Sequence, residues 1–105
     1  VVAGDFNDTP GRPPLAGLLQ TPNLFDVLSS PLLNGPRWTY QDGKNQFDYL
    51  LVSKALYDRM QAVGVERQGI FDAKNFKGQF GHFPEVTSKT NQASDHAAVW
   101  AQFNV

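Results

Sequence analysis

Five polar residues stand at the ends of apolar runs or inside one, and together they could do chemistry. Asp5 and Asn7 follow the first apolar run, Asp48 lies within another, and Asp95 and His96 precede the last. Carboxylates are the hard oxygen ligands that Mg²⁺ prefers, and an amide such as Asn7 can donate to a phosphate oxygen without adding charge. A histidine whose tautomer is fixed by a carboxylate can deprotonate water near neutral pH. Brought together, the set suits metal-assisted phosphoester hydrolysis.

Taken one at a time, the same residues have simpler structural explanations. Asp5 and Asn7 can close an Asx turn, and Asp48 can hydrogen-bond a neighbouring backbone group. Asp95 and His96 can lie in a solvated turn. The functional interpretation therefore depends on all three clusters converging from separate strands.

The first elements that must position these residues follow from the apolar pattern. Residues 1–3 are apolar without alternation, which is typical of a strand covered on both faces, and the segment 4–11 then breaks that strand. Further along, closely spaced leucines behind two prolines predict a short helix over residues 13–20. The first polar cluster is thus expected in a loop at the end of a buried strand.

The middle of the chain carries a hairpin pattern. Residues 37–41 and 47–52 are rich in aromatic and apolar side chains and flank a turn signal at 42–45, which predicts a β-hairpin. Ser53 is placed to cap a helix over residues 54–60. Asp48 is therefore expected inside the second strand of the hairpin.

A long connection separates the last two expected strands. Residues 62–67 and 97–103 read as strands, the second of them buried, and residues 72–93 between them show no sustained period. Trp38 and Trp100 both sit in strand patterns and are expected in the core.

Aromatic residues within this connection allow two interpretations. Phe76, Phe80 and Phe83 could stack on bases, but anchoring of the loop to the body is the expected role. His82 could line a substrate cleft, but a surface position is expected.

Composition limits the classes of function. The chain has 105 residues, no cysteine, and 9 Lys and Arg against 10 Asp and Glu, for a net charge of -1. One small soluble domain fits this length, and disulfides, thiolate zinc sites and cysteine nucleophiles are excluded. The balanced charge removes a general basic attraction for nucleic acid, and no apolar run approaches the roughly 20 residues of a membrane span. Because the chain starts without Met and within a strand pattern, we expect a fragment.

Three motifs resemble a known family when read in order. The segments GDFND at 4–8, FDYLLVS at 47–53 and SDHAAV at 94–99 are similar to the three C-terminal motifs of the endonuclease/exonuclease/phosphatase superfamily, the deoxyribonuclease I-like fold. The approach WTY at 38–40 is similar as well. The resemblance spans nearly the whole chain.

The resemblance implies an α/β fold of a defined kind. The family forms a four-layer sandwich of two similar halves, and residues 1–105 match the C-terminal half, a single partial domain with a mixed, mainly antiparallel sheet and short helices. The missing N-terminal half would be a partner, and it carries a metal-binding glutamate. Without it an apolar sheet face is exposed, so we expect the isolated chain to self-associate, a homodimer imitating the missing half, and to be at best feebly active.

The resemblance also implies a role for each of the five residues. Asp5 aligns or activates the nucleophile, and Asn7 holds the scissile phosphate. Asp95 binds the metal, with Asp5 and Asn7 as further members of the metal site. His96 activates or orients the attacking water and stabilises the transition state, and Asp48 orients His96. The cofactor implied is Mg²⁺, with Mn²⁺ or Ca²⁺ as alternatives.

The expected function is metal-dependent phosphoester hydrolysis by a nuclease or phosphodiesterase. A lipid or sugar-phosphate phosphatase is the alternative, because the same residues serve every phosphoester. A non-catalytic fold fragment or binding module is the further alternative. Gln46 stands where many family members carry Arg, which removes one phosphate-pairing cation and weakens the inference to nucleic acid as the substrate.

Overall fold

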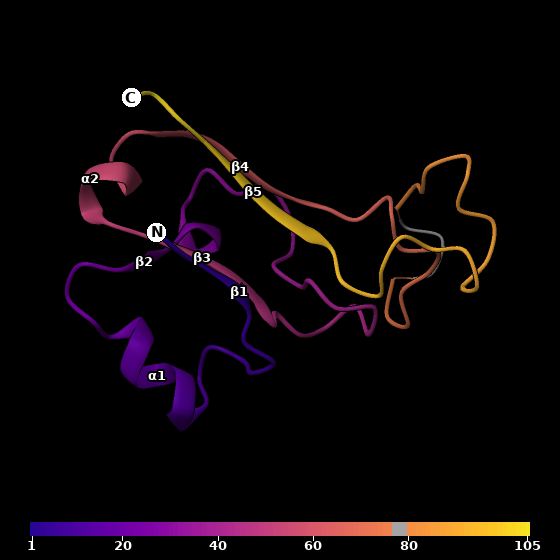
Figure 1. Cartoon of the computed structure of the whole chain (residues 1–105), viewed down its shortest axis with the longest axis horizontal. Helices are drawn as coiled ribbons and strands as arrows, with labels where there is room; N and C mark the ends of the chain where they lie inside the picture. The colour runs from indigo at the N-terminus through magenta and orange to yellow at the C-terminus, as the bar shows by residue number, and fades with distance from the viewer. Residues whose placement is uncertain (77–79) are drawn as a thin grey trace.

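Residues 1–76 and 80–105, which this computed structural model describes, form two small antiparallel sheets with short helices beside them (Figure 1). The elements in chain order are β1 Val2–Asp5, α1 Pro13–Leu19, β2 Phe25–Asp26, the 3-10 helix η1 Val27–Ser29, β3 Asp48–Val52, α2 Lys54–Tyr57, β4 Met60–Glu66 and β5 Ala98–Phe103. The fold is thus a small mixed α/β arrangement. Within the described residues no helix is long and apolar enough to cross a membrane.

The first sheet places two carboxylates opposite each other. Its order is β1-β3-β2, with β3 in the centre, and the antiparallel register pairs Asp5 with Asp48. Leu51 and Val52 of β3 are fully buried, so the apolar side chains of the strand fix this register. Like charges directly opposite on two strands destabilise a sheet. A positive or hydrogen-bonding group is therefore needed between them.

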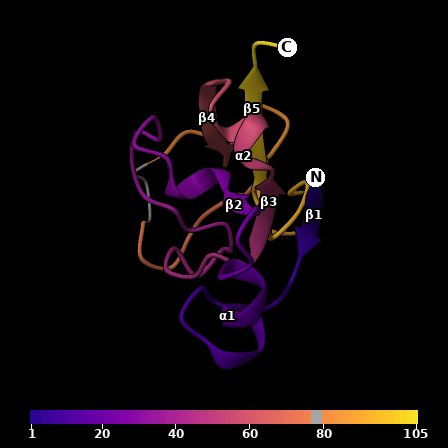
Figure 2. The same cartoon turned by 90° about the vertical axis from the view of Figure 1, so that its left-hand side faces the viewer.

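The second sheet positions a histidine near these two carboxylates. It consists of β4 and β5, antiparallel over Met60 to Glu66 and Ala98 to Phe103. β5 runs beside β3 in both views (Figures 1 and 2). His96 lies two residues before β5 and forms an isolated backbone bridge with Tyr40. The start of β5 therefore carries His96 towards the end of β3 where Asp48 stands.

Two helices cover parts of the first sheet. α1 confirms the helix expected over residues 13–20, has Pro at its first turn and buries Leu15 against Tyr49 and Leu51. α2 is shorter than the expected 54–60, although Ser53 caps it as expected by accepting a hydrogen bond from the Leu56 amide. Met60 instead begins β4, where it joins the core.

The predicted hairpin of residues 37–41 and 47–52 is wrong. β3 pairs with β1 along one side, and on its other side the two-residue β2 pairs with Leu51 and Val52, so residues 37–41 form no ladder with β3. Thr39 instead uses its side chain, and its Oγ1 accepts hydrogen bonds from the amides of Phe47 and Asp48. The turn at 42–45 is present, with Gly43 at a φ of 67° and Asp42 accepting from the amides of Lys44 and Asn45.

The expected burial of the first and last strands is also wrong. All four residues of β1 are exposed, and β5 alternates between exposed and half-buried positions. Both are edge strands with a single strand neighbour, so one side of each lacks cover from the described residues. Trp100, expected in the core, is 44% exposed, whereas Trp38 is buried as expected. The single mixed sheet is replaced by two antiparallel ones.

The connection from 72 to 93 forms a separate lobe to the right of Figure 1. Its residues 77–79 lie outside the described part, and the rest contains no helix or strand. Backbone hydrogen bonds fasten it at several points, from Lys74 to Gln41, from Phe83 to Gln68 and from Ala93 to Gly69. Its described ends are thus tied to the body of the molecule.

Candidate functional site

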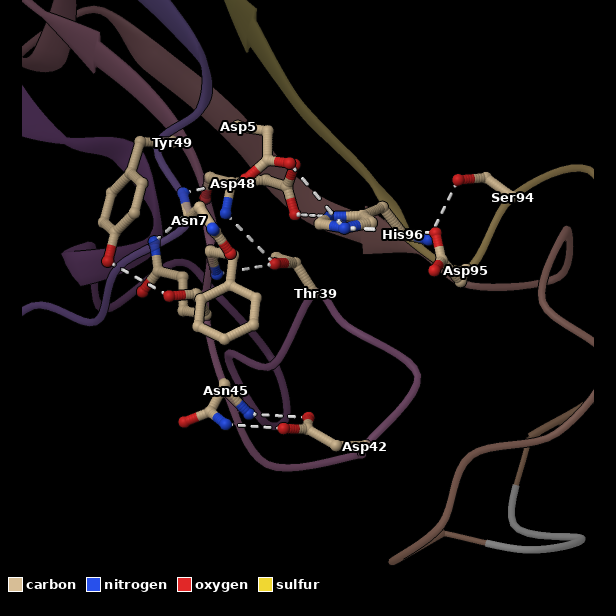
Figure 3. Close-up of polar contacts among 12 residues, drawn as sticks. Asp5, Asn7, Thr39, Asp42, Asn45, Asp48, Tyr49, Ser94, Asp95 and His96 are labelled. Carbon is tan, nitrogen blue, oxygen red and sulfur yellow. Dashed lines mark hydrogen bonds and ion pairs between the residues drawn. The ribbon is translucent and has the colours of Figure 1, made fainter.

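Asp5, Asp48 and His96 come together at the junction of the two sheets (Figure 3). One potential ligand atom from each lies within 4.8 Å of the others. Asp5 ends β1, Asp48 begins β3, and His96 precedes β5. Three segments distant in sequence thus meet at one point, as the convergence hypothesis requires for these three residues.

A short hydrogen bond joins His96 to Asp48. The His96 Nδ1–H donates to Asp48 Oδ2 over 2.7 Å, and the two side chains are 25% and 17% exposed. When His96 is neutral, this bond places the ring proton on Nδ1 and leaves Nε2 as an acceptor. The expected hydrogen bond between Asp48 and His96 is confirmed.

Asp5 faces the opposite nitrogen of the ring. Its Oδ2 lies 3.7 Å from His96 Nε2, and its Oδ1 accepts a hydrogen bond from the Asn7 amide over 2.8 Å. Asn7 adopts a φ of 50°, the left-handed conformation that Asn tolerates better than most residues. The simple Asx-turn explanation for Asp5 therefore holds alongside the functional one, because the turn aims the second oxygen at the histidine.

Asp95 and Asn7 lie at the margin of this cluster. Asp95 Oδ1 is 4.0 Å from His96 Nε2, and its side chain is 48% exposed. Ser94 Oγ accepts a hydrogen bond from the His96 amide and so shapes the turn that carries both residues. Asn7 is exposed and contributes no side-chain hydrogen bond to the cluster among the described residues. The structure thus brings three of the five residues, Asp5, Asp48 and Asp95, near the imidazole of a fourth, His96.

The surrounding carboxylates change the acidity of the histidine. Partial burial alone would lower the pKa of His96, but the hydrogen bond that its ring donates to Asp48 and the negative charges of Asp48, Asp5 and Asp95 outweigh it. The pKa of His96 is therefore raised above its ordinary value. The charged imidazolium is favoured at this position.

Two aromatic rings enclose His96, and sequence reasoning gave them no role. The Tyr40 ring centroid lies 5.1 Å from that of His96, and the Phe47 centroid lies 6.5 Å away. The two rings also pack on each other, with centroids 5.4 Å apart. The sequence could have indicated this role, because Tyr40 follows Thr39 in the segment 38–40 and Phe47 precedes Asp48 in the segment 47–53. They limit the freedom of the imidazole.

Thr39 connects the start of β3, which carries Asp48, to the segment before β5, which carries His96. It is fully buried, and its Oγ1 accepts from the amides of Phe47 and Asp48 over 3.0 and 3.2 Å. Its carbonyl accepts from the Ala97 amide over 2.7 Å. The threonine therefore fixes the start of β3 relative to the residue after His96.

We expect Thr39→Val to lower the free energy of unfolding by about 2 kcal/mol, because two part-buried amides lose their acceptor. Thr39→Ser, which keeps the hydroxyl, should cost only about 1 kcal/mol for the lost methyl group. Urea denaturation followed by fluorescence measures both. Val at the exposed Thr90 is the matched control and should change stability little; equal effects of Val and Ser at position 39 would refute the role of the hydroxyl.

Gln46 serves a structural purpose behind the site. It is 5% exposed, and its Nε2 donates to Asp26 Oδ2 over 2.9 Å. Asp26 also accepts from Arg37 at 2.8 Å and from the Leu28 amide. Tyr49, whose hydroxyl donates to the Gln46 carbonyl, is buried beside it, and burial raises its pKa. Gln46 thus faces a buried network and not the open side of His96.

The donor set at His96 fits a hard divalent cation. Three carboxylates surround one imidazole, so negative charge remains even when His96 is protonated. Among the described residues, the ion pairs of Asp5, Asp48 and Asp95 all go to His96. Asp48 is hydrogen-bonded to His96 Nδ1, whereas the side chains of Asp5 and Asp95 are about half exposed. Asp5, which belongs with Asp48 and His96 to the group of possible ligand atoms within 4.8 Å of one another, is therefore a carboxylate that could hold a hard cation, and Asp95 is a further carboxylate beside His96 Nε2.

The expected anchoring role of the aromatic residues in the long connection is confirmed for Phe76 and Phe80 and not for Phe83. Phe76 and Phe80 pack on the buried Trp38, with centroids 5.3 and 5.6 Å from its ring. Phe83 is 43% exposed. His82 is exposed, as expected, and its ring packs on Phe71 with centroids 5.3 Å apart.

No protein-family model, curated protein or solved structure matches this chain. The functional interpretation therefore depends on the residues and the geometry given above.

Proposed function

We propose that this chain carries the histidine half of a metal-dependent phosphoester hydrolase centre. One observation carries the proposal: His96 has its Nδ1 bound to Asp48 at 2.7 Å while its Nε2 faces the Asp5 carboxylate at 3.7 Å. A histidine oriented on one side and open to an acidic cluster on the other is suited to proton transfer beside a cation.

The roles of the residues follow from this arrangement. With its proton held on Nδ1, neutral His96 accepts a proton at Nε2 from an attacking water as the new oxygen–phosphorus bond forms and the bond from phosphorus to the leaving oxygen breaks; the leaving oxygen takes a proton from the solvent. Asp48 then stabilises the imidazolium. The charged ring can donate from Nε2 to an oxygen of the phosphoryl group as negative charge builds there. A divalent cation held by Asp5 and Asp95 would supply charge stabilisation to the same oxygens.

Membership of the endonuclease/exonuclease/phosphatase superfamily is part of the proposal, and the ordered motifs around Asp5, Asp48 and His96 support it. Under this proposal the chain provides one part of a two-part centre, and a metal-binding glutamate comes from the other half of the family's fold. Asn7 would hold the scissile phosphate from its place beside Asp5. The isolated 105-residue chain is then expected to bind metal weakly and turn over slowly.

Metal binding gives a test that needs no turnover. Titrating Mn²⁺ into the chain should broaden the NMR signals of Asp5, Asp95 and His96 first, because they surround the excess negative charge. Asp95→Asn should weaken the binding about tenfold or more. Asp58→Asn is the matched control, since Asp58 pairs with Lys54 on α2. Broadening centred on Asp58, or equal binding in both variants, would refute the metal site.

The substrate class is separated by comparing supercoiled DNA, an inositol phosphate and bis(p-nitrophenyl) phosphate in the full-length gene product. Preference for the diesters supports a nuclease or phosphodiesterase, and preference for the inositol phosphate supports a phosphatase. Failure to hydrolyse any of them with Mg²⁺, Mn²⁺ or Ca²⁺ would leave the chain as a non-catalytic module and overturn the proposal.

A further inference from the structure

Asn7, which holds the scissile phosphate under the proposed function, lies in an unusual backbone conformation. Its φ is 50°, in the left-handed region that costs a residue with a side chain free energy. The residue is exposed, and its amide donates to Asp5 Oδ1, while its side chain forms no hydrogen bond among the described residues. The contacts of its neighbours in the chain must therefore help to hold this turn.

Tyr49 contacts the residue on each side of Asn7. Its ring stacks on that of Phe6, with centroids 5.3 Å apart and 10° between the two planes. Its hydroxyl donates to the Asp8 carbonyl over 2.9 Å. The same hydroxyl lies 3.1 Å from the Gln46 carbonyl, so the two carbonyls share its one proton. One side chain thus fixes the chain immediately before and immediately after Asn7.

Tyr49 is itself held in the core of the first sheet. It lies in the central strand β3, is 2% exposed, and packs in one cluster with Leu15 of α1 and Leu51 of β3. Burial raises the pKa of its hydroxyl, which therefore stays protonated and remains a donor. Because core packing already orders this side chain, its bond to the exposed turn costs little additional conformational entropy.

Tyr49 acts on the site from the face of β3 that is turned away from His96. Neighbouring side chains of a strand point to opposite faces, so Asp48 points to His96 and Tyr49 points to residues 6–8 (Figure 3). The pKa of His96 is shifted by partial burial and by three carboxylates. Loss of the Tyr49 hydroxyl should therefore loosen Asn7 and leave proton transfer by His96 unchanged.

We propose that Tyr49 is a positioning residue that holds Asn7 ready for the phosphate. The inference rests on the proposed function, which gives Asn7 its ligand, and it assigns a role to a side chain that lies on the other face of β3. With the Phe6 ring and the Asp8 carbonyl held in place, the turn at Asn7 does not have to be ordered when substrate binds. Tyr49 therefore supports the affinity for the phosphoester and not the rate of the chemical step.

Tyr49→Phe in the full-length gene product tests the role of the hydroxyl, because it keeps the ring and its stacking on Phe6. KM for bis(p-nitrophenyl) phosphate should rise roughly 3- to 10-fold with kcat nearly unchanged, as expected when about one hydrogen bond that supports binding is lost. The pKa of His96, measured by NMR titration, should not move. The NMR order parameter of the Asn7 amide should fall below the value of about 0.85 that is typical of rigid backbone.

Phe6→Leu removes the stacking and keeps an apolar side chain, so it should raise KM in the same direction. Two control variants separate positioning from a general loss of stability. Tyr57→Phe removes a hydroxyl from α2, where the ring packs on Phe25. Val63→Ala removes volume from the other core cluster and lowers stability. Both controls should keep the KM and the Asn7 order parameter of the unmodified protein.

An unchanged KM and an unchanged Asn7 order parameter in Tyr49→Phe would overturn the inference. An equal rise of KM in Val63→Ala would also overturn it, because lost stability alone would then explain the effect. If the unmodified protein hydrolyses phosphoesters but Tyr49→Phe leaves Asn7 and KM as they were, only this inference fails. If Tyr49→Phe loosens Asn7 but the unmodified protein hydrolyses nothing, only the proposed function fails.

Discussion

Replacing His96 by Gln in the full-length gene product should lower kcat for phosphodiester hydrolysis by about 10²- to 10⁴-fold, with little change in KM. General acid–base catalysis by a positioned side chain contributes a factor of this order, and Gln cannot accept a proton at the place of Nε2. Steady-state kinetics with bis(p-nitrophenyl) phosphate measures the effect. The exposed His82→Gln is the matched control and should keep full activity.

An unchanged kcat in His96→Gln would contradict the proposed proton transfer. A rise in KM with kcat preserved would also contradict it, because it would indicate a histidine that only binds substrate.

Asp48→Asn should lower kcat by about 100-fold while leaving the fold intact. Asn keeps the size of the side chain, but it has no negative charge that keeps the proton of His96 on Nδ1. The pKa of His96 should fall towards its ordinary value, since Asp48 is the main cause that raises it. Histidine NMR titrations measure the pKa directly. Asp58→Asn on α2 is a carboxylate control, because the ion pair of Asp58 goes to Lys54 and not to the imidazole.

The pH dependence of activity should shift in a defined direction in the same variant, Asp48→Asn. His96 must be neutral to accept a proton, so activity rises as pH increases through its pKa. In the unmodified protein this limb lies above the ordinary histidine pKa, because the carboxylates raise it. In Asp48→Asn the limb should move to lower pH. A limb that stays in place, or moves upward, would show that Asp48 does not control His96.

Much of the site could be predicted because its residues interrupt strong local patterns. Asp48 sits in a run of apolar strand residues, and His96 stands directly before another, so each polar side chain had a defined strand end to occupy. The antiparallel register that pairs Asp5 with Asp48 then followed from burial of the apolar residues of β3. Helix α1 was equally predictable from its prolines and leucines.

The remaining features depend on tertiary contacts that local patterns do not contain. Residues 37–41 have strong strand propensity, but β1 and β2 are the strands that pair with β3, and Thr39 accepts the amides at the start of β3 through its side chain. Likewise the apolar run of β5 resembles a buried strand although only β4 pairs with it. The hydrogen bond from the Tyr49 hydroxyl to the Asp8 carbonyl joins residues 41 apart in sequence, and no local period predicts it.

The most direct test of the central claim is hydrolysis of bis(p-nitrophenyl) phosphate in ¹⁸O-labelled water by the full-length gene product, followed by mass spectrometry of both products. The proposed centre attacks phosphorus with water, so the label should appear in p-nitrophenyl phosphate, only with a divalent cation present, and not in nitrophenol. EDTA and His96→Gln should each suppress the labelled product. Label in nitrophenol, or labelled phosphate formed equally well by His96→Gln, would contradict the account.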